Sequence, residues 1–181
     1  MKNVNIDGLN FELFLSFDQI SNKIIELSRQ LKNAYLEDFP LCLIVLNGAS
    51  VFANELLKHL DSSVEVSLVK VKSYHGIQNR GDILVEYLPL DLIKNRKVLL
   101  IEDIVDTGNT LFFLRNELKK NGVIKIDCVT LLFKPKKYNY DLLPEYIGFN
   151  IGEEFVVGFG MDLNQKGREL KDIYKNIIYQ N

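Results

Sequence analysis

Hydrophobic residues recur along the first part of the chain with the period of a helix and then run together as in a core strand. Four large aliphatic residues fall on one helical face: Ile20, Ile24, Leu27 and Leu31. Ser16 and Gln19, at the start of this pattern, have the spacing of a capping box. Residues 41–46, "LCLIVL", are continuously apolar, as in a strand buried on both faces. The pattern therefore predicts an amphipathic helix over residues 16–33 and a buried strand after it.

Helical and extended patterns alternate through the next ninety or so residues. The pattern predicts helices over residues 50–60 and 110–122, and strands over residues 64–74, 97–101 and 124–133. Strand, helix and strand in repetition favour right-handed crossovers and a parallel sheet. We therefore expect an α/β fold. Because no repeat, low-complexity segment or linker interrupts the pattern, residues 1–181 are expected to form a single domain.

Composition narrows the class of protein. A hydrophobic share of 47% and a charged share of 25% are ordinary for a globular chain, and a formal net charge of −2 gives no general attraction to nucleic acid. Cys42 and Cys128 stand in apolar runs without metal or redox spacing, which indicates a reducing compartment. The amino terminus lacks the pattern of a secretion signal, and no apolar run has membrane-spanning length. We expect a cytoplasmic protein that binds neither nucleic acid nor membrane.

Candidate chemistry is concentrated in "VLLIEDIVDTGNTL", residues 98–111, where an aliphatic strand leads into a glycine turn. Open parallel sheets bind ligands at the carboxyl ends of their strands, where loops lead into helix amino termini. Gly108 permits a tight turn, and Thr107, Asn109 and Thr110 offer hydroxyl, amide and backbone N–H groups. The sequence therefore predicts a phosphate-binding turn here.

Two acids, Glu102 and Asp103, precede this turn and need a separate explanation. Carboxylates repel phosphate, but they suit a ligand that also brings sugar hydroxyls and Mg²⁺. Adjacent strand residues point to opposite faces, so both acids reach one ligand only if the strand ends before them, at Ile101. A plain turn capped by Asp106 and Thr107 would explain the glycine and leave the acid pair without a role.

The same stretch resembles the phosphoribosyl pyrophosphate (PRPP) signature of the type I phosphoribosyltransferases. Four further stretches, in the order of the hypoxanthine-guanine branch, extend the resemblance over most of the chain: "VLNGASVF", "KSYHG", "LLFKP" and "EEFVVGFGMDLNQKGREL". The resemblance implies a central parallel sheet flanked by helices, with a small hood formed by the terminal segments. It also implies a homo-oligomer, either a dimer or a tetramer.

The activity that the resemblance implies is purine salvage by pentosyl transfer. A 6-oxopurine, hypoxanthine or guanine, would react with PRPP to give IMP or GMP and pyrophosphate, with Mg²⁺ as cofactor. Glu102 and Asp103 would hold the ribose and the metal, and Asp162 would complete the metal site and border the purine. Metal charge makes pyrophosphate a better leaving group. Asp106 would act at the purine N7 as the catalytic acid–base residue.

Phosphate and base contacts follow from the same resemblance. The nucleotide phosphate would lie on residues 106–110, which are Asp106, Thr107, Gly108, Asn109 and Thr110. Lys134 would donate to the purine O6, and this contact would reject adenine, whose amino group presents hydrogens instead. Phe155 would stack on the purine ring while the Val156 backbone reads the base edge.

Pyrophosphate would be held by Asn47, Gly48 and Arg168. Ser73 and Tyr74 would belong to a flexible loop that excludes water from the reacting centre.

Two positions depart from the branch. Asn47 stands where lysine is usual, which predicts weaker binding of PRPP, and Gly152 stands where proline is common. The loop often has a cis peptide in the family, and the sequence leaves this open for Leu46 and Asn47.

Three alternatives stay open at this point. Some proteins of this fold bind RNA and use the PRPP loop as a sensor; such a regulator should have a basic face and lose the acid at Asp106. A xanthine-preferring transferase differs too subtly near Met161 to be separated by sequence. An adenine or orotate enzyme is opposed by Lys134 and by "FVVG".

Overall fold

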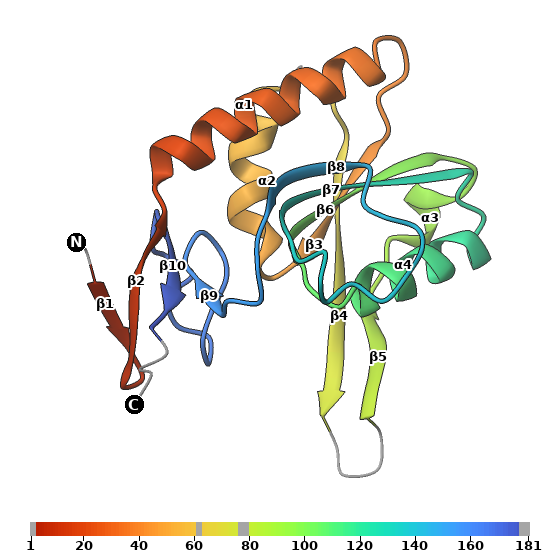
Figure 1. The fold of residues 1–181 in the computed structure, drawn as a ribbon. Coiled ribbons are helices and arrows are strands. Elements are labelled where there is room, and N and C mark those ends of the chain that lie inside the picture. The colour runs from red at the N-terminus through yellow and green to blue at the C-terminus, as the bar shows by residue number, and fades with distance from the viewer. Residues whose placement is uncertain (1–2, 61–62, 76–79, 178–181) are drawn as a thin grey trace.

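The computed structural model describes residues 3–60, 63–75 and 80–177 (Figure 1). Its centre is a six-stranded sheet in the order β5-β4-β3-β6-β7-β8. These strands are β3 (Leu41–Leu46), β4 (Val66–His75), β5 (Arg80–Tyr87), β6 (Lys97–Val105), β7 (Lys125–Phe133) and β8 (Tyr146–Asn150). Only β5 pairs antiparallel; the other neighbours in this sheet are parallel. The expected α/β fold with a central parallel sheet is confirmed.

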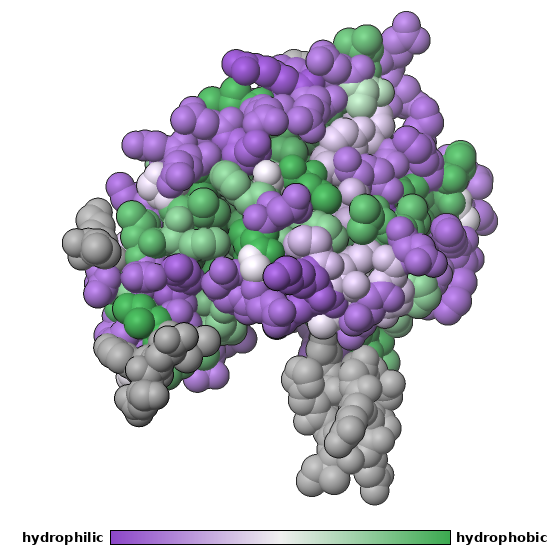
Figure 2. Space-filling model, in the orientation of Figure 1, coloured by the Kyte–Doolittle hydropathy of each residue, from purple (hydrophilic) through white to green (hydrophobic). Residues whose placement is uncertain are grey.

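Helices pack on both faces of this sheet. The helices are α1 (Phe17–Ala34), α2 (Ala49–Leu57), α3 (Leu90–Ile93) and α4 (Asn109–Lys120). Cys42 and Ile44 of β3 join the core under α1 and α2, whereas Leu41, Leu43 and Val45 join the core under α3 and α4. Because both faces of β3 are covered, its continuous apolar sequence is the expected one. In Figure 2, hydrophilic side chains cover most of the visible surface over α1.

Helix α1 begins as the sequence predicts. The Ser16 hydroxyl accepts from the Gln19 backbone N–H, the Gln19 side chain accepts from the Ser16 N–H, and the four aliphatic residues of its predicted face are buried. One step further on, the Phe17 N–H donates to Asp172 Oδ1 at 2.7 Å. This contact ties the start of α1 to a segment near the end of the described chain.

The terminal segments form a second, smaller sheet beside the main one, as Figure 1 shows. Its strands are β1 (Asn3–Ile6), β2 (Leu9–Leu15), β9 (Val156–Val157) and β10 (Ile173–Asn176), in the order β1-β2-β10-β9 and all antiparallel. Its core is Phe11, Val157 and Tyr174. This is the expected hood, and β9 within it directly follows Phe155.

One predicted boundary is wrong. Strand β6 does not end at Ile101 but continues to Val105, because β7 runs alongside it and pairs as far as Phe133. Glu102 is therefore a strand residue, aligned with Thr130 of β7.

The segment expected to be a flexible loop also differs in part. Ser73 and Tyr74 belong to β4, with Ser73 aligned to Ile83 of β5, and residues 76–79 lie outside the described part of the chain. Of the described helices, none is both long and apolar enough to cross a membrane.

Candidate active site

The turn from β6 into α4 is shaped by Gly108. Its φ of +85° is a left-handed conformation that favours glycine, and a Cβ there would come within 2.3 Å of the Tyr138 ring. The turn borders a cavity of about 100 Å³ with Thr107, Asn109 and Thr110 in its wall. Gly108 has no side chain to cap α4, and only the Asn109 N–H has a described acceptor there, Thr107 Oγ1 at 3.5 Å. Among the described residues, the Thr110 and Leu111 N–H groups remain available for an anion. The predicted phosphate-binding turn has the required shape.

A second cavity, of about 180 Å³, lies next to the first, and Ile104 and Asp106 line both. The remaining residues of its wall are Asp103, Lys134, Phe155, Val156, Met161 and Asp162. Strand ends of the main sheet and the hood thus contribute to one space. Six residues that the sequence proposed for metal and purine binding meet here.

Asp106 in this cavity is paired with a buried lysine. Lys134 Nζ donates to Asp106 Oδ2 at 2.9 Å, and the lysine side chain is only 5% exposed. Isolated burial of an ammonium group is costly, and the carboxylate offsets this cost. Lys137 Nζ lies 3.7 Å from Asp106 Oδ1, an oxygen without a hydrogen-bond partner among the described residues. Asp106 therefore has positive charge on both sides and one acceptor position unused.

Asp103 has no such partner. Burial raises the pKa of its carboxyl to about 6, against the opposing effects of nearby backbone N–H groups and of Arg168. Burial, together with the charge of Asp103, raises the pKa of Glu102 well above its usual range. Among the described residues, neither acid forms an ion pair. The end of β6 thus holds two carboxyl groups that ionise reluctantly until a cation approaches.

These two acids do not open onto the same space. Glu102 lines the cavity at the phosphate-binding turn, whereas Asp103 lines the second cavity. This follows from their places as neighbours within β6, since side chains alternate between the faces of a strand. The strand was expected to end before both acids, so that both could reach one ligand from the same side, and this expectation is wrong.

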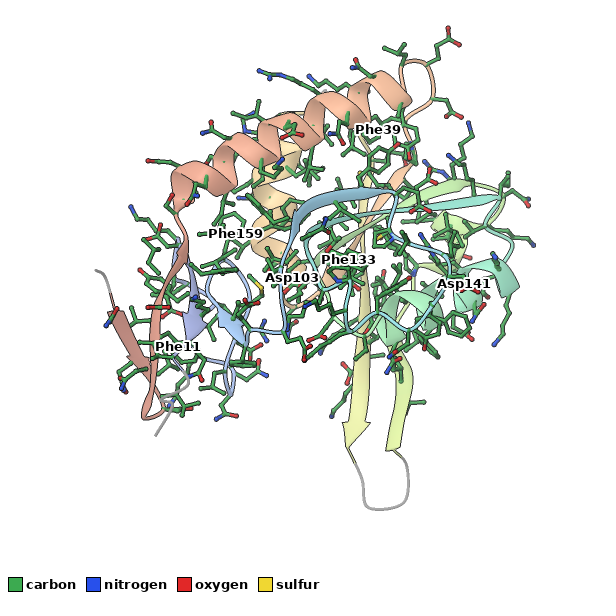
Figure 3. All side chains as sticks on the ribbon, in the orientation of Figure 1. Phe11, Phe39, Asp103, Phe133, Asp141 and Phe159 are labelled. Atoms are coloured by element: carbon green, nitrogen blue, oxygen red, sulfur yellow. The ribbon has the colours of Figure 1, made fainter. Side chains whose placement is uncertain are left out.

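The loop after β3 lies directly against Asp103. A Cβ added to Gly48 would be 1.9 Å from Asp103 Oδ2, so only glycine leaves room for the carboxylate. The peptide bond from Leu46 to Asn47, left open by the sequence, is cis, and Asn47 is exposed. In Figure 3, Asp103 lies on the side of the main sheet that faces the hood.

Asp162 and Arg168 come from the hood and are paired with each other. Arg168 Nη2 lies 2.6 Å from Asp162 Oδ1, and the Gln165 N–H donates to the other carboxylate oxygen at 2.8 Å. Arg168 Nη1 also donates to the Gly160 carbonyl at 2.6 Å. Gly160 packs closely on the loop after β3, because a Cβ there would be 2.1 Å from the Gly48 carbonyl oxygen. The hood and the loop at Gly48 therefore meet at Asp103.

Phe155 offers an aromatic surface to the cavity. It is 47% exposed, while its neighbours in the wall, Val156 and Met161, are buried. The Asn176 N–H donates to the Phe155 carbonyl, and the Phe11 ring lies 6.2 Å from the Phe155 ring. The hood thus fixes the backbone at Phe155 and leaves its ring open for stacking.

The donor set can be tested against Mg²⁺. In the part of the chain that the structure describes, no three His, Cys, Asp or Glu side chains are grouped as metal ligands. Both oxygens of Asp162 are already occupied by Arg168 and Gln165. Asp103, a half-buried carboxyl with no ion-pair partner among the described residues, does fit, because Mg²⁺ takes one or two carboxylates and fills its other positions with water and substrate oxygens.

Sequence reasoning missed some residues at the site. Ile104 lines both cavities. Lys137 approaches Asp106, although the sequence around it, "KPKKY", predicts only a solvated basic loop. Gly152, the position where the branch has proline, leaves room for the Glu154 carboxylate, which would be 2.7 Å from an added Cβ. No local pattern signals the approach of Lys137 to Asp106, because these residues come from separate parts of the chain.

The comparisons with known proteins agree on one family. A family model described as a phosphoribosyl transferase domain matches residues 16–164. The hypoxanthine-guanine phosphoribosyltransferase of Lactococcus lactis subsp. lactis (strain IL1403) is 38% identical over 168 residues, covering 92% of this chain and 91% of that protein.

Solved structures give the same result. A hypoxanthine phosphoribosyltransferase from Staphylococcus aureus superposes with a TM-score of 0.84 at 34% identity, covering 94% of each chain. The hypoxanthine phosphoribosyltransferase from Trypanosoma cruzi, in complex with the product IMP, has a TM-score of 0.83 at 27% identity, covering 98% of this chain and 100% of that one.

Proposed function

The chain belongs to the phosphoribosyl transferase domain family, and we propose that it is a purine-salvage enzyme that joins hypoxanthine or guanine to PRPP, releasing pyrophosphate and forming IMP or GMP. One observation carries this function most directly. The cavity beside the phosphate-binding turn combines the Lys134–Asp106 pair with the open ring of Phe155. A flat ring with adjacent polar atoms fits this combination.

The base would be recognised by the Lys134–Asp106 pair. In a 6-oxopurine, O6 accepts a hydrogen bond and N7, when protonated, donates one. Lys134 would donate to O6 and Asp106 would accept from the N7–H, so each ligand atom meets a group of opposite polarity. Adenine presents an amino group in place of O6, so a second donor would face the Lys134 ammonium and the hydrogen bond to the base would be lost. Phe155 would stack on the ring, with the Val156 backbone at the base edge.

Bond formation would proceed from this arrangement. The purine N9 attacks the ribose C1′ as the bond from C1′ to the pyrophosphate oxygen breaks, and the N7 proton passes to Asp106. A carboxylate is a weak base at its reference pKa of about 3.9, so hydrogen bonding and electrostatic stabilisation would supply part of its effect.

The PRPP contacts would divide between the two cavities. The turn over residues 106–110 would hold the 5′-phosphate, with Glu102 toward the ribose on that side and Asp103 on the other. Asp103 would hold Mg²⁺, with Asp162 nearby, and a bound Mg²⁺ would neutralise charge on the leaving pyrophosphate. Arg168, with Asn47 and Gly48, would contact the pyrophosphate. Ser73 and Tyr74, the residues assigned to the closing loop, would help to exclude water from the reacting centre.

We also propose that the chain acts as one phosphoribosyltransferase domain, in the cytoplasm, as a dimer or tetramer. Two observations support the cytoplasmic setting and the single unit. Both cysteines, Cys42 and Cys128, are free and buried, as in a reducing compartment. The hood takes strands from both ends of the described chain and completes the active site.

The test is nucleotide formation by purified protein from PRPP and each of hypoxanthine, guanine, xanthine and adenine, with and without Mg²⁺. We expect Mg²⁺-dependent turnover of hypoxanthine and guanine and none of adenine. If xanthine is the fastest substrate, the proposed preference for hypoxanthine and guanine is wrong. Absence of turnover with every base would overturn the proposal and direct attention to RNA binding, whose affinity should then fall steeply with salt.

A further inference from the structure

A cleft of about 310 Å³ lies outside the candidate active site, between α4 and the segment of residues 138–142. Its volume is at the lower end of the range for small-molecule sites, about 300 to 1,000 Å³. Figure 3 shows Asp141, which lines it, beside α4. None of the roles proposed above for PRPP, purine or Mg²⁺ involves this cleft.

One end of the cleft is aromatic. The rings of Phe112 and Tyr140 stack with a centroid distance of 4.3 Å and an angle of 11°, and the Tyr138 ring meets Tyr140 edge-on at 5.8 Å. Phe112 remains about half exposed even so. An exposed aromatic surface next to existing stacked rings favours the binding of another flat ring.

The wall behind these rings is held rigidly. Arg115 is buried and donates to the Leu142 and Leu143 carbonyls and to both oxygens of Glu145, at distances from 2.7 to 3.2 Å. These bonds fasten the segment after residue 138 to α4. The cleft is therefore preformed, which limits the entropy that a ligand loses by ordering it.

The other end of the cleft carries a cation that is not used elsewhere. Lys119 is exposed and, in the described ranges, has no ion-pair partner. It follows Phe112 by two turns on the same face of α4, about 10 Å further along the axis. Asn116 and Asn139 place amide groups in the wall of the same cleft. A ligand with a flat ring, a polar middle and an anionic end matches this order of groups.

We propose that this cleft is a second binding site, for a nucleoside 5′-monophosphate. The base lies against Phe112, the amides of Asn116 and Asn139 meet polar atoms of the base or ribose, and Lys119 binds the phosphate.

The cleft is also connected to the phosphate-binding turn. The Tyr140 hydroxyl donates to Asn109 Oδ1 at 2.8 Å, and the Asn139 N–H donates to the Thr107 carbonyl at 3.2 Å. An occupant that restrains Tyr140 therefore restrains the turn and tightens PRPP binding, a consequence that rests on the proposed function. By linkage, PRPP tightens binding in the cleft by the same factor.

Titration calorimetry with AMP tests the site itself, because AMP carries no 6-oxo group and binding needs no turnover. We expect one site in the intact protein, with the Kd raised at least about tenfold by Lys119→Ala and by Phe112→Ala. Both residues are exposed, so the fold should survive. Lys120→Ala is the matched control, because Lys120 is paired with Glu117 and does not line the cleft.

Two results would overturn the site: absence of AMP binding at millimolar concentration, or binding that PRPP displaces competitively and that Lys119→Ala leaves unchanged. The coupling between the cleft and the phosphate-binding turn has a separate test, because Tyr140→Phe removes the hydrogen bond from the Tyr140 hydroxyl to Asn109. We expect this variant to bind AMP while AMP no longer lowers the Kd of PRPP. If AMP still lowers it in this variant to the same extent, Tyr140 does not transmit the effect.

Discussion

The candidate active site holds two carboxylates whose surroundings are opposite. Asp106 is bonded at 2.9 Å to a buried lysine, Lys134, whereas Asp103 lies against Gly48 with a raised pKa and, among the described residues, no ion-pair partner. On the proposed function, the end where the protein supplies its own cation takes an uncharged base. At the other end the cation would arrive with the substrate, as Mg²⁺ with PRPP. The proposed function therefore divides the cavity into a base end and a metal end.

The largest effect should come from removing the paired carboxylate. Asp106→Asn keeps the shape but cannot take the N7 proton, and we expect kcat to fall about 10²- to 10⁴-fold, the usual range for a lost acid–base group. Steady-state kinetics with hypoxanthine measure this. Asp91→Asn, an exposed carboxylate on α3, serves as control. An unchanged kcat in the Asp106 variant would remove this residue from the chemistry.

Replacing Lys134 should weaken the discrimination between hypoxanthine and adenine at the same end of the cavity. Lys134→Gln offers the base both a donor and an acceptor, so kcat/KM for hypoxanthine should fall about a hundredfold while discrimination against adenine narrows. Kinetics with both bases measure the ratio. Lys136→Gln changes an exposed neighbour and should leave it unchanged. If the ratio also stays unchanged in the Lys134 variant, the lysine does not read O6.

At the metal end, Gly48→Ala should act through Asp103. The new Cβ would collide with the carboxylate, and we expect kcat/KM for PRPP to fall about tenfold or more. In an Asp103→Ala background the methyl group has room, so the same change should cost little, and the two effects should not add. Additive losses would show that Gly48 acts independently of Asp103.

A smaller effect should follow from adding a cation beside the metal end. Asn47→Lys adds to the loop the positive charge that the family resemblance predicts there, and an exposed charge interaction of up to about 1 kcal/mol corresponds to a roughly fivefold lower KM for PRPP. Asn54→Lys, on the exposed side of α2, controls for added charge. A KM that fails to fall in the Asn47 variant counts against pyrophosphate contact at this position.

The smallest effect should be on stability, and its sign depends on pH. In the folded, metal-free protein the pKa of Asp103 is about 6, above its ordinary value of about 3.9, so the folded state binds more protons between these values. Stability should therefore fall as pH rises from about 4 to about 6.

Mg²⁺ with PRPP should reverse this loss, raising Tm by a few degrees more at pH 7.5 than at pH 5, because the ion binds the ionised carboxylate. Scanning calorimetry measures both changes. Asp103→Asn should lose part of the pH dependence, because Glu102, whose pKa is also raised, still titrates. If the variant keeps all of it, Asp103 does not contribute.

The local sequence pattern predicted most helices and strands correctly, but it did not predict contacts between segments that are distant in the sequence. The capping box at Ser16, the apolar strand over residues 41–46 and the helix after Gly108 follow from interactions within a few residues, and all are confirmed. The predicted end of β6 was wrong, because its last residues are held by pairing with β7 rather than by their own propensity. The Asp162–Arg168 pair and the Tyr140–Phe112 stack had no signal, since each depends on side-chain placement after folding.

The order of strands in the hood has a consequence for synthesis on the ribosome. Strand β10 lies between β2 and β9, so the strand that follows Phe155 has its antiparallel partner only after residue 176 has been added. The main sheet, with the phosphate-binding turn, is complete in sequence by residue 150. A nascent chain can therefore assemble the turn well before it can present a stacking surface to a purine.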